Sequence, residues 1–363
     1  MHTQRTYVPF QSIWKMGIDH PYSLWVADGA VAWSCGQCPI DSNGAIIAPW
    51  DLVAQRRFVA GLIKRTLETG AIAPTHVCKL IVYYVPEADA NASGMIDEMR
   101  SQFGSNVVVV PVAVPHFYYE GMLIEVDVFA STNRPRYWTA EDEHGRVWVQ
   151  FVDSGELIHA KVTCDALGGG WETVRAWLEK GMQLSGLSRE HWLADYWFVS
   201  SDEASGLLHG AAKDGFCSDP GAAALCDWGD ETRVVADIIF VPGGGAVADL
   251  VLESEGLRFR RRGRFFHISA RRAEPTSLIQ QTAGNMGAVR RALRAEGLGF
   301  DNVSKATTLY AGGSKPAELH DNMSVRNSHY EQPGPASTGL PVLRFPFSSS
   351  LITVDVIGTV PMS

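Results

Sequence analysis

Several features that mark other classes of protein are scarce or missing in this sequence. Cysteine is scarce, with six unevenly spaced residues among 363, which indicates reduced thiols and not a disulfide framework. No apolar run approaches the roughly 18 residues of a membrane span, and residues 1–16 lack an apolar signal segment. Basic residues number 31 against 40 acidic ones, which disfavours nonspecific nucleic-acid binding. We therefore expect a cytoplasmic protein that binds a small molecule and neither nucleic acid nor membrane.

What is present is the composition of an ordinary globular protein, with 46% hydrophobic and 20% charged residues. The length allows two or three domains. A first landmark indicates three, because a glycine that ends an amphipathic segment recurs as Gly70, Gly186 and Gly297. These glycines are separated by 116 and 111 residues.

A second landmark agrees with the first. A strand of alternating apolar residues with a central aspartate recurs around Asp127, Asp237 and Asp355, at spacings of 110 and 118 residues. Over both steps, the glycines span 227 residues and the aspartates span 228. Such agreement between two independent patterns is hard to obtain by chance, so the chain is predicted to contain three units. Their predicted ranges are residues 1–133, 134–248 and 249–363.

Each unit shows the same order of elements, with a helix, a β-rich run and a closing strand. The helices have start signals: an N-cap at Asp51, glycines at 168–170, and a turn with an N-cap at 275–277. Because each amphipathic helix covers one face of a sheet, the three sheets must cover one another by their remaining faces. The sequence therefore predicts a mixed α/β (α+β) fold, an intramolecular pseudo-trimer with sheets inside and helices outside. We expect a monomer or a weak homo-oligomer.

Short motifs in the first unit carry a resemblance to a known family. They are Pro21-Tyr22-Ser23, then Cys35-Gly36-Gln37 before Pro39, and Leu123-Ile124-Glu125-Val126-Asp127. With these motifs the chain resembles the RidA/YjgF family of reactive-imine deaminases, which assemble as trimers with clefts between subunits. The second unit resembles the family only in its order of elements, and the third adds the stretch 335–338. A single chain of three such units is also similar to the chorismatases, which hydrolyse an enol-ether acid.

The resemblance implies where the site residues lie. The family's cleft tyrosine corresponds to Tyr22 and its cleft asparagine to Asn322, while its cleft glutamate survives only as Glu125. Family members hold a substrate carboxylate with an arginine, but this chain has Asn106 and Ser337 at that place, the latter followed by Thr338. The family's turn at Cys35 approaches the ligand with its backbone, so Cys35 is expected near the cleft.

Glu125 is the residue that we expect to transfer protons. On an alternating strand it shares a face with Asp127, and a glutamate in a mostly apolar cleft stays protonated to higher pH, which suits proton transfer. The equivalent positions in the other units hold Val235 and Thr353. The alternative is that Glu125 is a solvated residue at a strand edge.

The repeated aspartates are expected to be structural, because a catalytic role would not be needed three times. Lys79 and Lys305, on the neighbouring strands, are predicted to pair with Asp127 and Asp355 and to fix strand register. No such partner is predicted for Asp237, because the second unit has Asp195 at the lysine position.

Other candidate groups have weaker patterns. Cys35-x-x-Cys38 lacks a second ligand pair or a thioredoxin-like helix, so no metal, redox centre or cofactor is predicted. His116 precedes an aromatic stretch that could cover the Glu125 cleft, and His329 lies near 335–338. Either histidine could act as an acid or base near neutral pH, although a lone histidine is more often structural.

Arginines are concentrated between Arg258 and Arg272, where there are seven in an otherwise acidic chain. Alternation puts four of them on one face, which is most often solvated. Alternatively, Arg271 or Arg272 replaces the missing family arginine and grips a carboxylate bidentately, with Arg344 as a second candidate.

Three hypotheses for function remain open. The first is a cofactor-independent hydrolase or deaminase that acts on a small imine, enamine or unsaturated carboxylic acid, with Glu125 as general acid and base. The second is chorismatase-like hydrolysis of an enol-ether acid in the same cleft. The third is a non-catalytic small-molecule binding protein.

Overall fold

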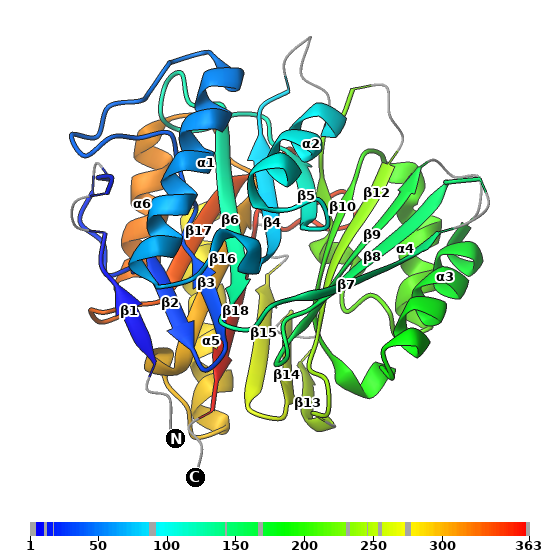
Figure 1. Ribbon diagram of the computed structural model, residues 1–363. Coiled ribbons are helices and arrows are strands. Elements are labelled where there is room, and N and C mark those ends of the chain that lie inside the picture. Colours follow the sequence, from blue (N-terminus) through cyan, green and yellow to red (C-terminus); the bar gives the residue numbers. More distant parts are fainter. Residues whose placement is uncertain are drawn as a thin grey trace.

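The structure is a computed structural model that describes residues 5–10, 13–16, 18–86, 92–141, 144–165, 170–229, 233–244, 246–252, 256–272 and 277–360. These residues form three six-stranded sheets with helices on their outer sides (Figure 1). We call each sheet with its helices a unit, numbered in chain order. Strand orders correspond from unit to unit, which confirms the predicted fold of three mixed α+β units.

Unit 1 has the strand order β1-β2-β3-β6-β4-β5. Its elements are β1 (Thr6–Val8), β2 (Trp25–Asp28), β3 (Val31–Ser34), α1 (Leu52–Thr69), β4 (Val77–Tyr84), α2 (Ala92–Phe103), β5 (Val108–Ala113) and β6 (Ile124–Ser131). Neighbouring strands are antiparallel except β4 and β5, which are parallel and joined by α2.

Unit 2 has the strand order β11-β10-β12-β9-β8-β7. Its elements are β7 (Arg136–Glu141), β8 (Val147–Asp153), β9 (Ile158–Asp165), α3 (Gly170–Leu184), β10 (Trp192–Val199), α4 (Ser205–Lys213), β11 (Ala224–Leu225) and β12 (Arg233–Phe240). The edge strand β11, which follows α4, has two residues and is again parallel to its neighbour.

Unit 3 has the strand order β13-β14-β15-β18-β16-β17. Its elements are β13 (Ala246–Leu252), β14 (Leu257–Arg262), β15 (Phe265–Arg271), α5 (Leu278–Ala295), β16 (Val303–Tyr310), α6 (Pro316–Asn327), β17 (Ala336–Pro341) and β18 (Ile352–Thr359). Because β13 pairs with β14, the boundary predicted at 248/249 cuts through a strand of this unit. Unit 3 therefore begins no later than Ala246.

The two helix starts that the structure describes agree with their predicted caps. Asp51 Oδ1 accepts a hydrogen bond from the Ala54 amide at 2.9 Å, and Ser277 forms a capping box with Gln280. The other predicted start signals, at 168–169 and 275–276, lie outside the described residues. None of the described helices is long and apolar enough to span a bilayer.

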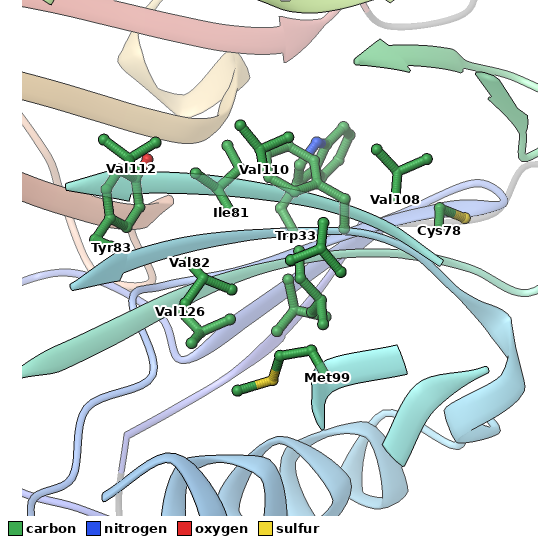
Figure 2. Close-up of a cluster of buried hydrophobic side chains, with 14 of the residues drawn as sticks. Trp33, Cys78, Ile81, Val82, Tyr83, Met99, Val108, Val110, Val112 and Val126 are labelled. Atoms are coloured by element: carbon green, nitrogen blue, oxygen red, sulfur yellow. The ribbon is translucent and has the colours of Figure 1, made fainter. Parts of the chain in front are cut away.

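The inner faces of the three sheets pack against one another. Figure 2 shows the alternation that makes this possible: Val82 and Val126 point toward Met99 of α2, while Ile81 and Val110 point to the opposite side. The main buried cluster contains residues from both sides of the unit 1 sheet and from all three units, so the units share one core.

Contacts between strands define three seams, one between each pair of units. At the unit 3–unit 1 seam, β16 and β17 lie against β2 and β3. At the unit 1–unit 2 seam, β4 and β5 lie against β8 and β9, and at the unit 2–unit 3 seam β10 lies against β14 and β15. Since β17 and β5 hold the same place in their sheets, as do β3 and β9, the first two seams are built alike.

Buried ion pairs cross two of these seams. Lys79 Nζ lies 2.7 Å from a carboxylate oxygen of Asp237, and Lys305 Nζ lies 2.9 Å from one of Asp127. The predicted pairs of Lys79 with Asp127 and of Lys305 with Asp355 are therefore wrong. Each lysine projects from the inner face of its own sheet toward the next sheet, so it meets an aspartate of another unit.

The third seam departs from this pattern. The strand irregularity after Trp192 corresponds to those after Val77 and Val303, so pairing with the neighbouring strand puts Ala194, and not Asp195, at the position of the two lysines. Asp355 instead lies 3.2 Å from His267 Nε2 of its own unit. The aspartate without a lysine is therefore Asp355, not the predicted Asp237.

Candidate active site

The cleft around Glu125 lies at the unit 3–unit 1 seam. Unit 1 contributes β6, the turn at 36–40 and the loop at 117–122, and unit 3 contributes α6 and β17. Its walls are mostly aromatic or apolar, and the aromatic residues are Phe10, Trp14, Tyr22, Phe117, Tyr118 and Tyr119. A cleft of this composition with few polar groups is typical of small-molecule sites.

Glu125 reaches this cleft from the start of β6, past the backbone of Gly36. A β-carbon at position 36 would lie 1.6 Å from Glu125 Oε1, so only glycine leaves room for the carboxyl group there. Burial and the negative charge of Asp127 raise the pKa of Glu125 to about 8, against the opposing effects of Cys38 and Lys305. The side chain is therefore mainly protonated at neutral pH and can donate a proton.

Arg326 on α6 brings a positive charge to the same cleft. Its side chain is 3% exposed, and its Nε donates a hydrogen bond of 2.7 Å to Asn322 Oδ1 one turn earlier. Asn322 Nδ2 in turn donates to the Thr282 hydroxyl at 2.7 Å, which anchors the arrangement to α5. No carboxylate among the described residues pairs with Arg326. A buried guanidinium without an acid is costly unless a ligand supplies the negative charge.

Further hydrogen-bond donors line the cleft. The hydroxyls of Tyr22 and Tyr118 and the indole nitrogen of Trp14 are buried and make no hydrogen bond of standard geometry with the described residues, with Ser337 the polar neighbour of Tyr22 and Tyr310 that of Tyr118. Buried donors are usually satisfied, so a group of three in one cleft indicates a polar ligand. The cleft shares Phe10, Trp14, Met16 and Tyr22 with a wider groove, which provides a route from solvent.

Beneath the cleft, a buried polar network fixes the two units in register. Thr338 Oγ1 donates to Asp127 and accepts from Lys305 Nζ at 2.7 Å, while Lys305 also donates to the Ser34 carbonyl at 3.0 Å. The thiol of Cys35 is buried, and burial raises its pKa well above the usual range. Among the described residues, no three His, Cys, Asp or Glu side chains are grouped to hold a metal ion.

Comparisons with known proteins support the fold. No family model matches the chain, and no curated protein matches it. Among solved structures, a chorismatase matches 78% of this chain and 93% of its own length, with a TM-score of 0.50 and 12% identity. This chain has a chorismatase-like fold.

Single RidA-like proteins match one unit's length of the chain. A YjgF-family protein from Mycobacterium tuberculosis covers 36% of this chain with 100% of its own, at 21% identity and a TM-score of 0.29. A Rid-family protein from Yersinia pestis does the same at 20% identity and a TM-score of 0.31. Likeness at this level of identity concerns the fold alone.

Three of the predicted site residues, Glu125, Tyr22 and Ser337, line the cleft. Thr338 lies directly beneath it, and Asn322 orients Arg326 without lining the cleft itself. Cys35 is buried behind the turn, whose residues Gly36 and Cys38 form the wall instead.

His116 and His329 do not line the cleft, although the residues that follow His116 do. Burial lowers the pKa of both histidines. His329 lies on a separate groove of unit 3, where its Nδ1 is 3.0 Å from Arg290. The predicted aromatic wall is therefore present without its histidine.

Four predicted binding residues lie elsewhere. Asn106 precedes β5, and strand pairing shows that Val109, and not Asn106, is the residue of unit 1 equivalent to Ser337, so the predicted alignment is wrong by three residues. Arg271 is held bidentately by Asp219 of unit 2, at 2.8 and 3.2 Å, and is not available to a ligand. The side chain of Arg272 lies against Gly284 of α5, and Arg344 pairs with Asp202 at 2.7 Å on the surface.

The arginine cluster is mainly structural, but it is not a solvated face. Arg264 lies 2.6 Å from Asp28 of unit 1 and 2.9 Å from Glu156 of unit 2, and Arg262 pairs with Asp249 at 2.8 Å. Arg262 therefore forms an ion pair within unit 3, and Arg264 forms ion pairs that connect unit 3 to units 1 and 2.

The cleft residue that sequence reasoning missed is Arg326. A signal was present, since Asn322 and Arg326 are four residues apart and so share a helix face. Nothing in that spacing indicates that the face meets a cleft at a seam.

Proposed function

We propose that this protein is a cofactor-independent hydrolase of a small unsaturated monocarboxylic acid of the enamine or imine type. The observation that carries the proposal is the presence in one aromatic cleft of Glu125, protonated at neutral pH, and Arg326, which has no acid partner among the described residues. Arg326 would hold the substrate carboxylate by charge-assisted hydrogen bonds. The aromatic walls would pack against the unsaturated part of the substrate.

In the proposed reaction, Glu125 gives its proton to the β-carbon of the enamine. The C=C electron pair forms the new C–H bond, and the nitrogen lone pair forms an iminium ion. The Glu125 carboxylate then takes a proton from water as the water oxygen attacks the iminium carbon. Transfer of the new hydroxyl proton to nitrogen and cleavage of the C–N bond, as the C=O bond forms, release ammonia and a keto acid. No oxidant or metal ion is consumed, and Glu125 is protonated again after each turnover.

A chorismatase-like hydrolysis is the second candidate, and the specific observation in its favour is the match over 93% of a chorismatase. The enol-ether chemistry would also begin with a proton from Glu125 to carbon. The enol-ether acid of that reaction, chorismate, carries two carboxylates. Among the described residues that line the cleft, Arg326 is the single arginine and there is no lysine. We therefore favour a monocarboxylate.

The test compares turnover of both substrate classes by the purified protein. An imino acid generated in situ by an amino-acid oxidase is assayed for faster ammonia release, and chorismate is assayed for pyruvate. Glu125→Gln should lower kcat on the true substrate by about 10²–10⁴-fold. Arg326→Met should mainly raise KM, because it removes the carboxylate contact.

The control is Arg344→Met, which removes an arginine that pairs with Asp202 outside the cleft and should leave both constants unchanged. Full turnover by Glu125→Gln would refute the proposal. Saturable binding of acids that depends on Arg326, with no turnover of either class, would replace it with a small-molecule binding function.

A further inference from the structure

The unit 1–unit 2 seam corresponds to the active-site seam but carries different side chains. Asp127 and Asp237 occupy the same place in their sheets, and counting from them puts Val235 at the place of Glu125 and Lys161 at that of Cys35. Arg100 comes from α2, which precedes β5, as Arg326 comes from α6, which precedes β17. This seam has lost the carboxylic acid and gained a cation.

Lys161 is buried and forms no ion pair with a carboxylate in the part of the chain that the structure describes. It is 3% exposed and has no hydrogen bond or ion pair with the described residues. Asp237, its neighbour across the strand ladder, has both oxygens occupied by Lys79 at 2.7 and 2.8 Å. An ammonium group in this position is stable only if another anion reaches it.

Other groups converge on the same place. Arg100 Cζ lies 5.3 Å and Lys161 Nζ 5.5 Å from the centre of the Trp148 ring, so both cations flank one indole. Among the described residues, the Arg100 guanidinium donates to uncharged oxygens, Gln150 Oε1 at 3.1 Å and the Val107 carbonyl at 3.5 Å. The Thr163 hydroxyl is buried and has no partner among the described residues.

Acidic groups near the seam do not neutralise it. Asp165 is exposed and lies 3.4 Å from Arg233, and Asp97 is exposed on α2. Burial and the positive charges of Arg100 and Arg233 lower the pKa of Lys161 to about 7, against the opposing effect of the Asp165 carboxylate. Trp148, Thr163 and Arg100 are each partly exposed, so the seam is open to small solutes.

We propose that this seam is a second ligand site, which binds a compact oxyanion through Lys161 Nζ, the Thr163 hydroxyl and the Arg100 guanidinium. The ligand chemistry is that of a carboxylate or a phosphate or sulfate group. Bound there, the anion joins units 1 and 2, since Arg100 belongs to one and Lys161 to the other. The site is independent of Glu125 and Arg326.

The test measures thermal unfolding of the full chain with sulfate, phosphate or acetate, against chloride at equal ionic strength. We expect a saturable rise in Tm with at least one oxyanion, and the acetate and sulfate arms distinguish a carboxylate from a tetrahedral ligand. Lys161→Met should weaken binding of that anion at least tenfold by calorimetry. Lys213→Met, an exposed lysine of the same unit, should bind it as the wild-type protein does.

Two further variants keep the test decisive. Arg326→Met should retain the rise in Tm with the anion, which separates this site from the active-site cleft. Thr163→Val should weaken that rise, and it replaces Lys161→Met in the test if the latter does not fold. Failure of every oxyanion to exceed chloride would overturn the proposal. An unchanged response in both seam variants would do the same.

Discussion

At the scale of single residues, Gly36 sets how closely the backbone can approach the Glu125 carboxyl group. Position 36 requires glycine for a steric reason, since a β-carbon there would overlap Glu125 Oε1. Because the neighbours Cys35 and Gln37 are buried, the turn has little freedom to move away.

Gly36→Ala is therefore expected to displace Glu125 and to lower turnover by tenfold or more, with a loss of about 1–3 kcal/mol in unfolding free energy. Activity assays and urea unfolding would measure the two effects. The matched control is Gly61→Ala on the exposed side of α1, where nothing lies within 4 Å of the new β-carbon. That change should be neutral or should stabilise by up to about 1 kcal/mol. Equal effects of the two changes would contradict the steric explanation.

The raised pKa of Glu125 predicts a pH dependence of stability. Between its ordinary value of 4.5 and about 8, the folded protein keeps a proton that the unfolded chain loses. The unfolding free energy of the wild-type protein should therefore fall, relative to Glu125→Gln, by roughly 4 kcal/mol from pH 5 to pH 9. Urea unfolding at several pH values would measure this, with the exposed Glu120→Gln as control. Turnover that needs the protonated acid should decline above about pH 8. If the unfolding free energies of the wild-type protein and Glu125→Gln changed in parallel with pH, the raised pKa of Glu125 would be ruled out.

The residues of the cleft were only partly predictable. Glu125 and Tyr22 could be found because they lie in short local motifs of unit 1. Arg326 could not, since its role depends on the packing of α6 against a different unit. The apparent substitutes Arg271 and Arg344 are paired with acids of unit 2 that no local pattern reveals.

At the scale of elements, the sequence predicted α1, α3 and α5. It did not predict α2, α4 and α6, the helices that connect the parallel strands in each unit. The first set shows apolar periodicity and ends near glycine, and Gly186 and Gly297 adopt the expected left-handed conformation. At the end of α1 the left-handed residue is Ala71, one place beyond Gly70. The inner face of α6 carries Asn322 and Arg326 in place of apolar residues, so the helix lacks a regular apolar stripe.

The cap at Asp51 offers a direct test at this scale. Asp51→Ala should cost about 1 kcal/mol of unfolding free energy, because the Ala54 amide loses its acceptor. Asp51→Ser, which can still cap, should cost only a few tenths of that amount. Denaturant midpoints of the two variants would measure the difference. If both variants were equally destabilised, the side-chain cap would not be the source of the effect.

At the scale of the whole molecule, the number of units could be predicted, but the partners of Lys79 and Lys305 could not. Repeats are visible in spacing, whereas the direction of each ion pair depends on how the sheets pack. Burial lowers the pKa of Lys79 and raises that of Asp237, each against the effect of its partner.

Breaking the buried pair should therefore be costly. Lys79→Met is expected to lower the unfolding free energy by about 3–5 kcal/mol, because it leaves Asp237 buried without a counterion. The double variant Lys79→Met/Asp237→Leu should recover much of that loss. The surface control Arg344→Ala, which breaks the pair with Asp202, should cost less than about 1 kcal/mol. Urea unfolding of all four proteins would decide, and a double variant as unstable as Lys79→Met would contradict the explanation.

Joining three units in one polypeptide also changes what mutation can do. In a ring of identical subunits every substitution appears three times, so an unpaired internal charge would be tripled. Here Glu125 and Lys161 each occur once, at different seams, and neither has a copy at the equivalent position of another unit. The covalent connection thus lets one interface specialise in proton chemistry while its neighbour evolves separately.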